Sequence, residues 1–207
     1  MSKTTWFHAL RVIGCGVWLI CPRATAAEDL APDPEGYLRH WLMLAPIPLP
    51  EGAPASDLIL KEQLKGEALL KPSDGESVTL NGRVSTWRRS HAATNFFDFN
   101  ATLKTQNDRA AGFLVTYVEC DQDIPEVTMA VASNDQGRIY FNGVDIYAFT
   151  EARPLMLDAD KGRVTLKKGI NVIVFKVINE QNSWQAAMRL TDKAGVPLKN
   201  LKVRLAP

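Results

Sequence analysis

The chain has 207 residues, of which 46% are hydrophobic and 23% charged, and its net charge is +1. This composition is typical of a globular protein and excludes a disordered, collagen-like or disulfide-dense chain. Its basic residues are scattered and almost balanced by acidic ones. The sequence therefore has no basic stripe for the phosphates of a nucleic acid, and we expect no nucleic-acid partner.

The first 27 residues have the order of a secretory signal peptide. Lys3 and Arg11 precede an apolar run over residues 12–21, and the small residues 24–27 follow it. Ten apolar residues are too few to cross a bilayer, which takes about 20. We therefore expect residues 1–27 to be removed and the mature chain to be exported, to the periplasm or the extracellular space, without a membrane span.

Cleavage changes both the charge and the cysteine count. Three of the 24 basic residues and none of the 23 acidic ones leave, which gives the mature chain a net charge of −2. Only Cys120 remains of the three cysteines, so no disulfide can form within the exported chain. We expect a polar lead-in over residues 28–36 and one domain over 37–207, with Cys120 buried as an inert thiol.

The chain from residue 37 begins with a short apolar run over 38–44 that ends in a proline-rich stretch. One helix is expected over residues 56–65. Ser56 or Asp57 can cap it, apolar residues recur at helical spacing, and Gly66 can end it.

Beyond Gly66 the pattern is that of β-strands. Short runs rich in Val, Ile, Phe and Tyr alternate with Gly, Asn and Asp turns, and almost no helix lies between them. This pattern predicts an all-β fold, an antiparallel β-sandwich or jelly roll. The expected strands are 77–90, 96–103, 110–120, 126–132, 138–141, 144–149, 163–166, 170–178 and 184–190.

The segment 138–147 predicts a β-hairpin. Asn142-Gly143 suits a two-residue turn with positive φ at both central positions. A regular register would place Ile139 opposite Ile146 and Arg138 opposite Tyr147. One face, expected in the core, is then Ile139, Phe141, Val144 and Ile146. The other, expected to point outward, is Arg138, Tyr140, Asp145 and Tyr147.

Two later strands have one apolar face each. In 170–178 the face that carries Lys176 is expected to point outward at its end. In 184–190 an apolar row begins with Trp184 and continues through Ala186, Met188 and Leu190, so Trp184 is interpreted as a packing residue.

Four segments along the chain resemble one family of modules. They are Trp41–Ile47, the run SNDQGRIYFNG over 133–143, the run LKKGINV over 166–172, and the closing strand at Trp184. In this order, over about residues 37–203, they are similar to galactose-binding-like β-sandwich accessory modules of secreted bacterial proteins. The sequence departs from that pattern at Ala45 and Ile47, which replace Gly and Phe, and at residues 134–136, which replace a tighter Asp-Asp-Gly turn. The resemblance implies a non-catalytic fold, carbohydrate-binding in some members and structural in others.

The catalytic inventory is short, and we expect no enzyme. No nucleophile elbow, zinc-protease helix or phosphate loop is present. His40 and His91 are interpreted as residues with local hydrogen bonds, although a pocket that joins either to a buried carboxylate would favour catalysis. No cofactor is expected. A structural Ca²⁺ remains an alternative at Asp121-Gln122-Asp123 and Asn134-Asp135, where ordinary turn chemistry is the competing interpretation.

The sequence leaves two hypotheses for the partner. Sugar binding requires an aromatic platform with polar groups beside it, and the outward hairpin face offers Tyr140 and Tyr147 with Arg138 and Asp145; Trp87 is a second candidate. The hairpin side chains can equally pair across the strands without a ligand. The first hypothesis is weak carbohydrate binding, and the alternative is a structural or interaction module whose partner is another exported protein.

Overall fold

The computed structural model describes residues 30–80 and 82–207. The predicted signal peptide therefore lies outside the described residues. From Leu30 onward the lead-in is attached to the domain, because Leu30 forms a β-bridge with Val203 and the Asp33 carboxylate accepts hydrogen bonds from the backbone of Glu35 and Tyr37. Among the described residues, no helix is both long enough and apolar enough to span a bilayer.

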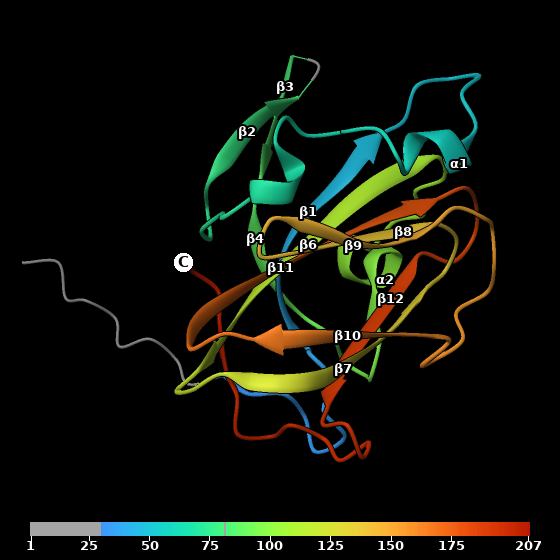
Figure 1. Ribbon diagram of the computed structural model, residues 1–207. Helices are drawn as coiled ribbons and strands as arrows, with labels where there is room; N and C mark the ends of the chain where they lie inside the picture. Colours follow the sequence, from blue (N-terminus) through green and yellow to red (C-terminus); the bar gives the residue numbers. More distant parts are fainter. Residues whose placement is uncertain (1–29, 81) are drawn as a thin grey trace, which may run out of the picture.

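Two antiparallel sheets face each other (Figure 1). The larger sheet has the order β4-β1-β6-β11-β8-β9, and β13 also pairs with β6. Its strands are β1 (His40–Pro48), β4 (Arg88–His91), β6 (Ala110–Cys120), β8 (Gly137–Phe141), β9 (Val144–Phe149), β11 (Gly169–Asn179) and β13 (Lys202–Arg204).

The smaller sheet has the order β10-β7-β12-β5 and lies below the larger one in Figure 1. Its strands are β5 (Phe97–Asp98), β7 (Ile124–Ser133), β10 (Asp160–Leu166) and β12 (Gln185–Thr191). The hairpin of β2 (Ser77–Leu80) and β3 (Arg83–Thr86) projects separately. The helices are short: α1 (Ala55–Leu58), the 3-10 helix η1 (Glu67–Leu69) and α2 (Phe99–Leu103). The predicted all-β sandwich is thus confirmed.

The core between the two sheets is built from alternate residues of their strands. Leu114, Val118 and Cys120 of β6 point into it, as does the predicted apolar row of β12 from Ala186 to Leu190, with Trp184 before it. Trp184 is fully buried and stacks on Phe99 at a ring distance of 4.3 Å, so its interpretation as a packing residue is confirmed.

Gly112 and Cys120 of β6 also contribute to this core. Gly112 lies beneath the rings of Phe99 and Trp184, and a Cβ there would lie 2.6 Å and 2.7 Å from their carbon atoms, so only glycine fits. Cys120 is buried as predicted, and its thiol donates to the carbonyl of Lys167 over 3.1 Å.

A second apolar cluster covers the opposite face of the larger sheet. Residues 49–70, which we call the strap, place Leu49, Leu58, Ile59 and Leu64 against alternate residues of β1, β6, β8 and β11. Figure 1 shows α1 and the chain around it above the larger sheet. The central strands β6, β8 and β11 of the larger sheet are therefore buried on both faces, whereas the edge strands β4 and β9 have exposed residues. The outward position expected for Lys176 is wrong, since its side chain has 0% exposure beneath the strap.

The predicted helix over 56–65 is much shorter in the structure. Helix α1 ends at Leu58, and no side chain caps its start at Pro54. Ile59 and Leu64 are both buried, and the Gln63 backbone N–H donates to the Glu67 carboxylate, which holds an irregular turn between them. Contact of these apolar residues with the sheet overrides the helical spacing.

Two predicted strands also differ. Residues 77–90 form three short strands instead of one. In 96–103, only Phe97–Asp98 is a strand, and the Asp98 carboxylate accepts from the Ala101 backbone N–H to begin α2. Phe97 and Phe99 are both buried, so the sequence shows the alternation of a strand although the strand ends at Asp98.

Candidate functional site

The β8–β9 hairpin has the predicted turn but not the predicted register. Asn142 and Gly143 have φ of +50° and +82°, as expected of the turn. Tyr140 lies opposite Asp145, but Ile139 lies opposite Tyr147, and the ladder shifts between these two pairs. The predicted pairs of Ile139 with Ile146 and of Arg138 with Tyr147 are therefore wrong. A β-bulge at Ile146 moves Tyr147 to the opposite face from the one expected.

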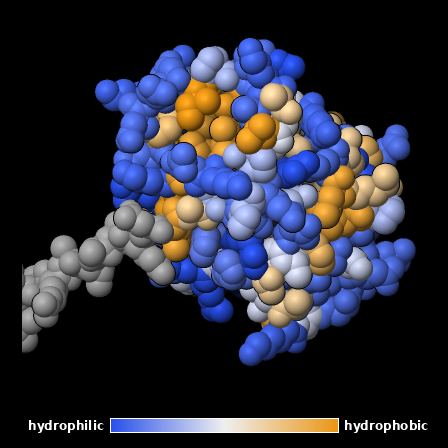
Figure 2. Space-filling model, turned by 90° about the horizontal axis from the view of Figure 1, so that it is seen from below, coloured by the Kyte–Doolittle hydropathy of each residue, from blue (hydrophilic) through white to orange (hydrophobic). Residues whose placement is uncertain are grey.

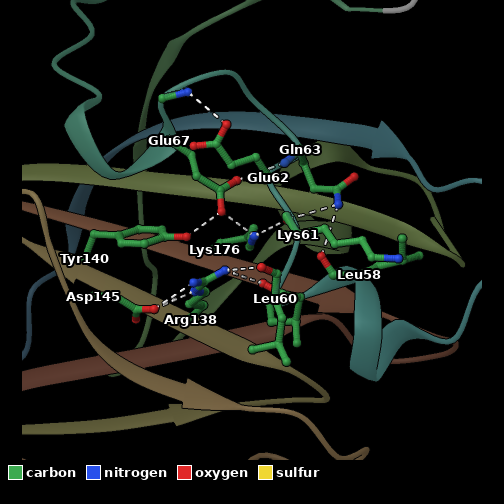
Figure 3. Close-up of polar contacts among 12 residues, drawn as sticks. Leu58, Leu60, Lys61, Glu62, Gln63, Glu67, Arg138, Tyr140, Asp145 and Lys176 are labelled. Carbon is green, nitrogen blue, oxygen red and sulfur yellow. Dashed lines mark hydrogen bonds and ion pairs between the residues drawn. The ribbon is translucent and has the colours of Figure 1, made fainter.

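Tyr140 lies beneath the strap instead of pointing to solvent (Figure 3). Its hydroxyl donates to Glu67 Oε1 over 2.5 Å, and Lys176 Nζ donates to the same oxygen over 2.5 Å and to the Lys61 carbonyl over 2.9 Å. Burial, reinforced by the Glu67 carboxylate, raises the pKa of Tyr140. Burial lowers the pKa of Lys176, against the opposing effect of Glu67. These groups attach the strap to the sheet.

Arg138 and Asp145 complete this network at its edge (Figure 3). The Arg138 guanidinium donates to Asp145 Oδ2 over 2.7 Å and 3.1 Å, and to the Leu60 carbonyl of the strap over 2.6 Å. It also lies 5.0 Å from the centre of the Tyr140 ring. Arg138, Tyr140 and Asp145 of the predicted sugar face therefore all have partners within the protein.

Tyr147 takes part in a separate network that joins the two sheets. Its hydroxyl donates to Asp160 Oδ2 of β10 over 2.7 Å, and Arg153 donates to both the hydroxyl and the carboxylate. Burial and the bond to Asp160 raise the pKa of Tyr147. The bulge in β9 places Tyr147 on the face that allows this contact. In a regular hairpin Tyr147 would lie on the opposite face.

The expected aromatic platform is absent from the surface of the described residues. Trp87 is 1% exposed and packs in the strap-side cluster, and Tyr140 is 4% exposed. No Phe, Trp or Tyr side chain in residues 30–80 and 82–207 is fully exposed at the surface. The face seen from below carries its hydrophobic residues in separate patches between hydrophilic ones (Figure 2). The exposed positions expected for Tyr140 and Trp87 are wrong because the sequence does not reveal that the strap covers them.

In each of the two loops considered for Ca²⁺, one carboxylate is hydrogen-bonded to a neighbouring segment of the protein. Asp123 accepts from the Lys168 backbone N–H and the Lys167 ammonium, and these bonds lower its pKa. Asp135 Oδ2 accepts from the Glu180 backbone N–H over 2.9 Å. In the described part of the chain, no group of three or more His, Cys, Asp or Glu side chains is placed to hold a metal.

A pocket lies where the β6–β7 turn meets the segment before β13, and we call it the loop pocket. Its volume is 460 Å³. Apolar atoms come from Ile124, Leu198 and Leu201, and polar groups come from both loops. The polar side chains that line it are Glu119, Asp121, Gln122, Lys199, Asn200 and Lys202.

The polar side chains of the loop pocket differ from those of the hairpin in one respect. Glu119 is paired with Arg204, but the other five have no hydrogen bond or ion pair with any residue that the structure describes. Their donors and acceptors are available to a ligand. The sequence singled out 121–123 as oxygen-rich but gave no signal for 199–202, because only the fold brings β13 beside β6.

No protein-family model and no curated protein matches this chain. Among solved structures, the PA14 domain of the MpAFP antifreeze protein is similar over 89% of this chain and 97% of that chain. The sequence identity is 9% and the TM-score is 0.41. A likeness this weak carries no argument about the fold or the ligand of this chain.

Proposed function

We propose that this protein is an exported, non-catalytic β-sandwich module that binds a saccharide in the loop pocket. One observation carries the proposal: a 460 Å³ pocket is lined by five polar side chains that make no hydrogen bond or ion pair with the described residues. Carboxylate, amide and ammonium groups are the donors and acceptors that suit sugar hydroxyls. The site thus differs from the hairpin face that the sequence favoured.

The character of the pocket also sets the expected affinity. Its apolar lining is aliphatic, so a sugar ring would pack on Ile124 and Leu198 without an aromatic stack. Binding then depends on hydrogen bonds, whose net contribution is about 0.5–1.5 kcal/mol each, or about 1.5–3 kcal/mol where one group is charged. We expect weak binding that a few contacts dominate.

Calorimetric titration of the exported protein with a panel of neutral and acidic oligosaccharides tests this function. At least one is expected to bind, and Asp121→Ala with Lys199→Ala is expected to weaken it at least tenfold, since 1.4 kcal/mol is tenfold in affinity. Glu151→Ala with Lys161→Ala removes the same charges from exposed positions elsewhere and should leave binding unchanged. No binding across the panel, or equal weakening by both double variants, would overturn the proposal.

A second candidate function, association with another protein, is favoured by the edge strand β9. Val144 and Ile146 are 61% and 39% exposed, and exposed Leu60 and Leu69 lie on the strap beside the hairpin. Leu69 lies next to Gly143, and the Leu60 carbonyl accepts a hydrogen bond from Arg138, so both leucines lie close to the hairpin. Among the described residues only β8 pairs with β9, so the other edge of β9 has unpaired backbone groups.

The occupant that this edge fits is a second copy of the chain. The edge strands β4 and β10 carry basic side chains that disfavour pairing with another strand. Arg89 and Arg163 are paired with Asp74 and Glu126, so Arg88 on β4 and Lys161 on β10 carry the charge that would repel a second copy. On β9 the only charge, Asp145, is neutralised by Arg138. Two β9 edges can therefore meet about a two-fold axis. The bulge at Ile146 makes this contact depend on side chains more than on a long backbone ladder.

Sedimentation of the exported protein over a range of concentrations tests this association. A dimer is expected, and Ile146→Lys should shift it to monomer because the buried ammonium groups of the two copies would repel each other. Val84→Lys introduces the same charge at a residue that is 71% exposed on the β2–β3 hairpin and should preserve the dimer. A chain that stays monomeric at every concentration, or a dimer unaffected by Ile146→Lys, would exclude it.

A further inference from the structure

A second, smaller pocket lies at the opposite edge of the larger sheet, where β1 and β4 pair. Its volume is 210 Å³, and neither function proposed above uses it. Its lining residues are Leu30, His40, Arg89, Ser90, His91 and Leu205. None of them is acidic. The titratable side chains that line the pocket are therefore two imidazoles and one guanidinium.

The backbone places these three side chains on one face. His40 lies directly opposite His91 in the antiparallel ladder, and their ring centres are 4.5 Å apart. Arg89 precedes His91 by two residues, and alternation puts both on the same side of β4. Arg89 lies opposite Leu42, which belongs to the strap-side cluster, so the face is the one that the strap covers further along the sheet.

Arg89 retains hydrogen-bonding capacity in this position. Its Nε lies 3.5 Å from Asp74 Oδ2, and its backbone N–H donates to Asp74 Oδ1. Beyond Asp74, no residue in the described part of the chain pairs with the Arg89 side chain. A guanidinium has five N–H donors, so its terminal nitrogens are available to a ligand. A neutral imidazole has one N–H donor and a protonated imidazole has two.

Two leucines form the apolar walls of the pocket. Leu205 is 7% exposed, and Leu30 is partly buried against the same apolar cluster. The Arg89 side chain is 53% exposed and His91 is also exposed, so a bound anion would be held mainly by charge-assisted hydrogen bonds, which are stronger than those between neutral groups. A pocket with cationic and N–H donors, apolar walls and no acid in its lining favours an anion over a cation.

We propose that His40, Arg89 and His91 form an anion-binding pocket that takes a carboxylate, phosphate or sulfate group. Arg89 holds two oxygens of the group through its terminal nitrogens, the His91 imidazole donates to a remaining oxygen atom, and His40 lines the pocket beside His91. The anion can be free or can be the acidic group of a saccharide. The chemistry is the same in both cases, and the experiment separates the two sources.

Adjacent arginines on β4 provide a matched pair of variants. Arg88 and Arg89 are both exposed, but Arg88 lies opposite Met43, which points into the core between the sheets, so Arg88 is on the other face. Titration with inorganic phosphate is expected to show saturable binding to one site. Arg89→Gln should weaken this binding at least tenfold, His91→Gln should weaken it severalfold, and Arg88→Gln should change it less than twofold.

The competing ligands and the remaining variants complete the experiment. A uronic acid should displace phosphate, whereas its methyl ester should not, because the ester has no carboxylate. If both displace phosphate, the sugar ring and not the acidic group is what binds, and the proposal is overturned. If Arg88→Gln and Arg89→Gln weaken phosphate binding equally, the anion is attracted to the basic edge in general and not to this pocket. If phosphate does not bind saturably, the site is excluded. Asp121→Ala with Lys199→Ala should leave phosphate binding intact, so this inference and the loop-pocket function can fail separately.

Discussion

Replacement of Lys176 by methionine is expected to destabilise the protein by about 3–5 kcal/mol. The ammonium and the Glu67 carboxylate are 0% and 1% exposed and lie 2.5 Å apart beneath the strap. Removal of one partner of a buried pair leaves an uncompensated charge away from water, which costs this much. Because a domain of this kind has a total stability of about 5–15 kcal/mol, the variant would lose a large part of it. Denaturant unfolding measures the change.

A matched variant shows whether burial causes the loss. Lys167→Met removes an ammonium from the ion pair with Asp123, whose side chains are 65% and 54% exposed, and is expected to cost about 0–1 kcal/mol. Lys176→Met combined with Glu67→Gln should recover much of the loss, since the buried charge is gone and the amide oxygen can still accept from Tyr140. If the two single lysine variants are equally stable, the strap is not attached through this pair.

The strap also explains how far the sequence predicts the fold. Alternation of apolar residues is a local property, and it correctly predicted the strands β6 to β12 that face the core between the sheets. It assigns one face of each strand to the interior and the other to solvent. In β8 and β11 both faces are buried, because the strap lies across them: its Glu67 is 73 residues before Tyr140, and its Lys61 is 115 residues before Lys176. Tyr140 and Lys176 were therefore assigned to solvent.

The candidate site was predicted less well than the fold, for two physical reasons. A single extra residue at the Ile146 bulge reverses the face of Tyr147, and nothing in the hairpin sequence marks it. The loop pocket combines residues near 121 with residues near 200, which become neighbours only when β13 pairs with β6. The pair of His40 and His91 likewise results from the register of β1 with β4, over 51 positions of sequence.

Alkaline pH is expected to unfold the protein in one transition above pH 10. All four tyrosines of the chain, Tyr37, Tyr117, Tyr140 and Tyr147, have a pKa raised mainly by burial. In the unfolded chain a tyrosine loses its proton near pH 10. Between that pH and the raised native pKa, the unfolded state binds fewer protons than the native state, so stability falls as pH rises. Below pH 10 the contribution of these groups is fully present.

The size of the effect follows from the same linkage. Each tyrosine that stays protonated in the native state lowers stability by up to about 1.4 kcal/mol per pH unit in this range. Lys176, whose native pKa is lowered, acts in the opposite direction, but its contribution is complete once the pH exceeds the unfolded value of about 10.4. Above that pH Lys176 no longer changes the slope, and the four tyrosines make stability fall as pH rises.

Absorbance of tyrosinate and near-ultraviolet circular dichroism, followed together from pH 8 to 12, measure this transition. The tyrosinate signal should appear together with the loss of tertiary structure, because the hydroxyls of Tyr117, Tyr140 and Tyr147 donate to Pro72, Glu67 and Asp160 inside the fold. Tyr147→Phe should make the fall of stability with pH less steep by one proton. Titration of tyrosine near pH 10 in a chain that keeps its tertiary signal would show that these hydroxyls reach solvent and that the strap opens without global unfolding.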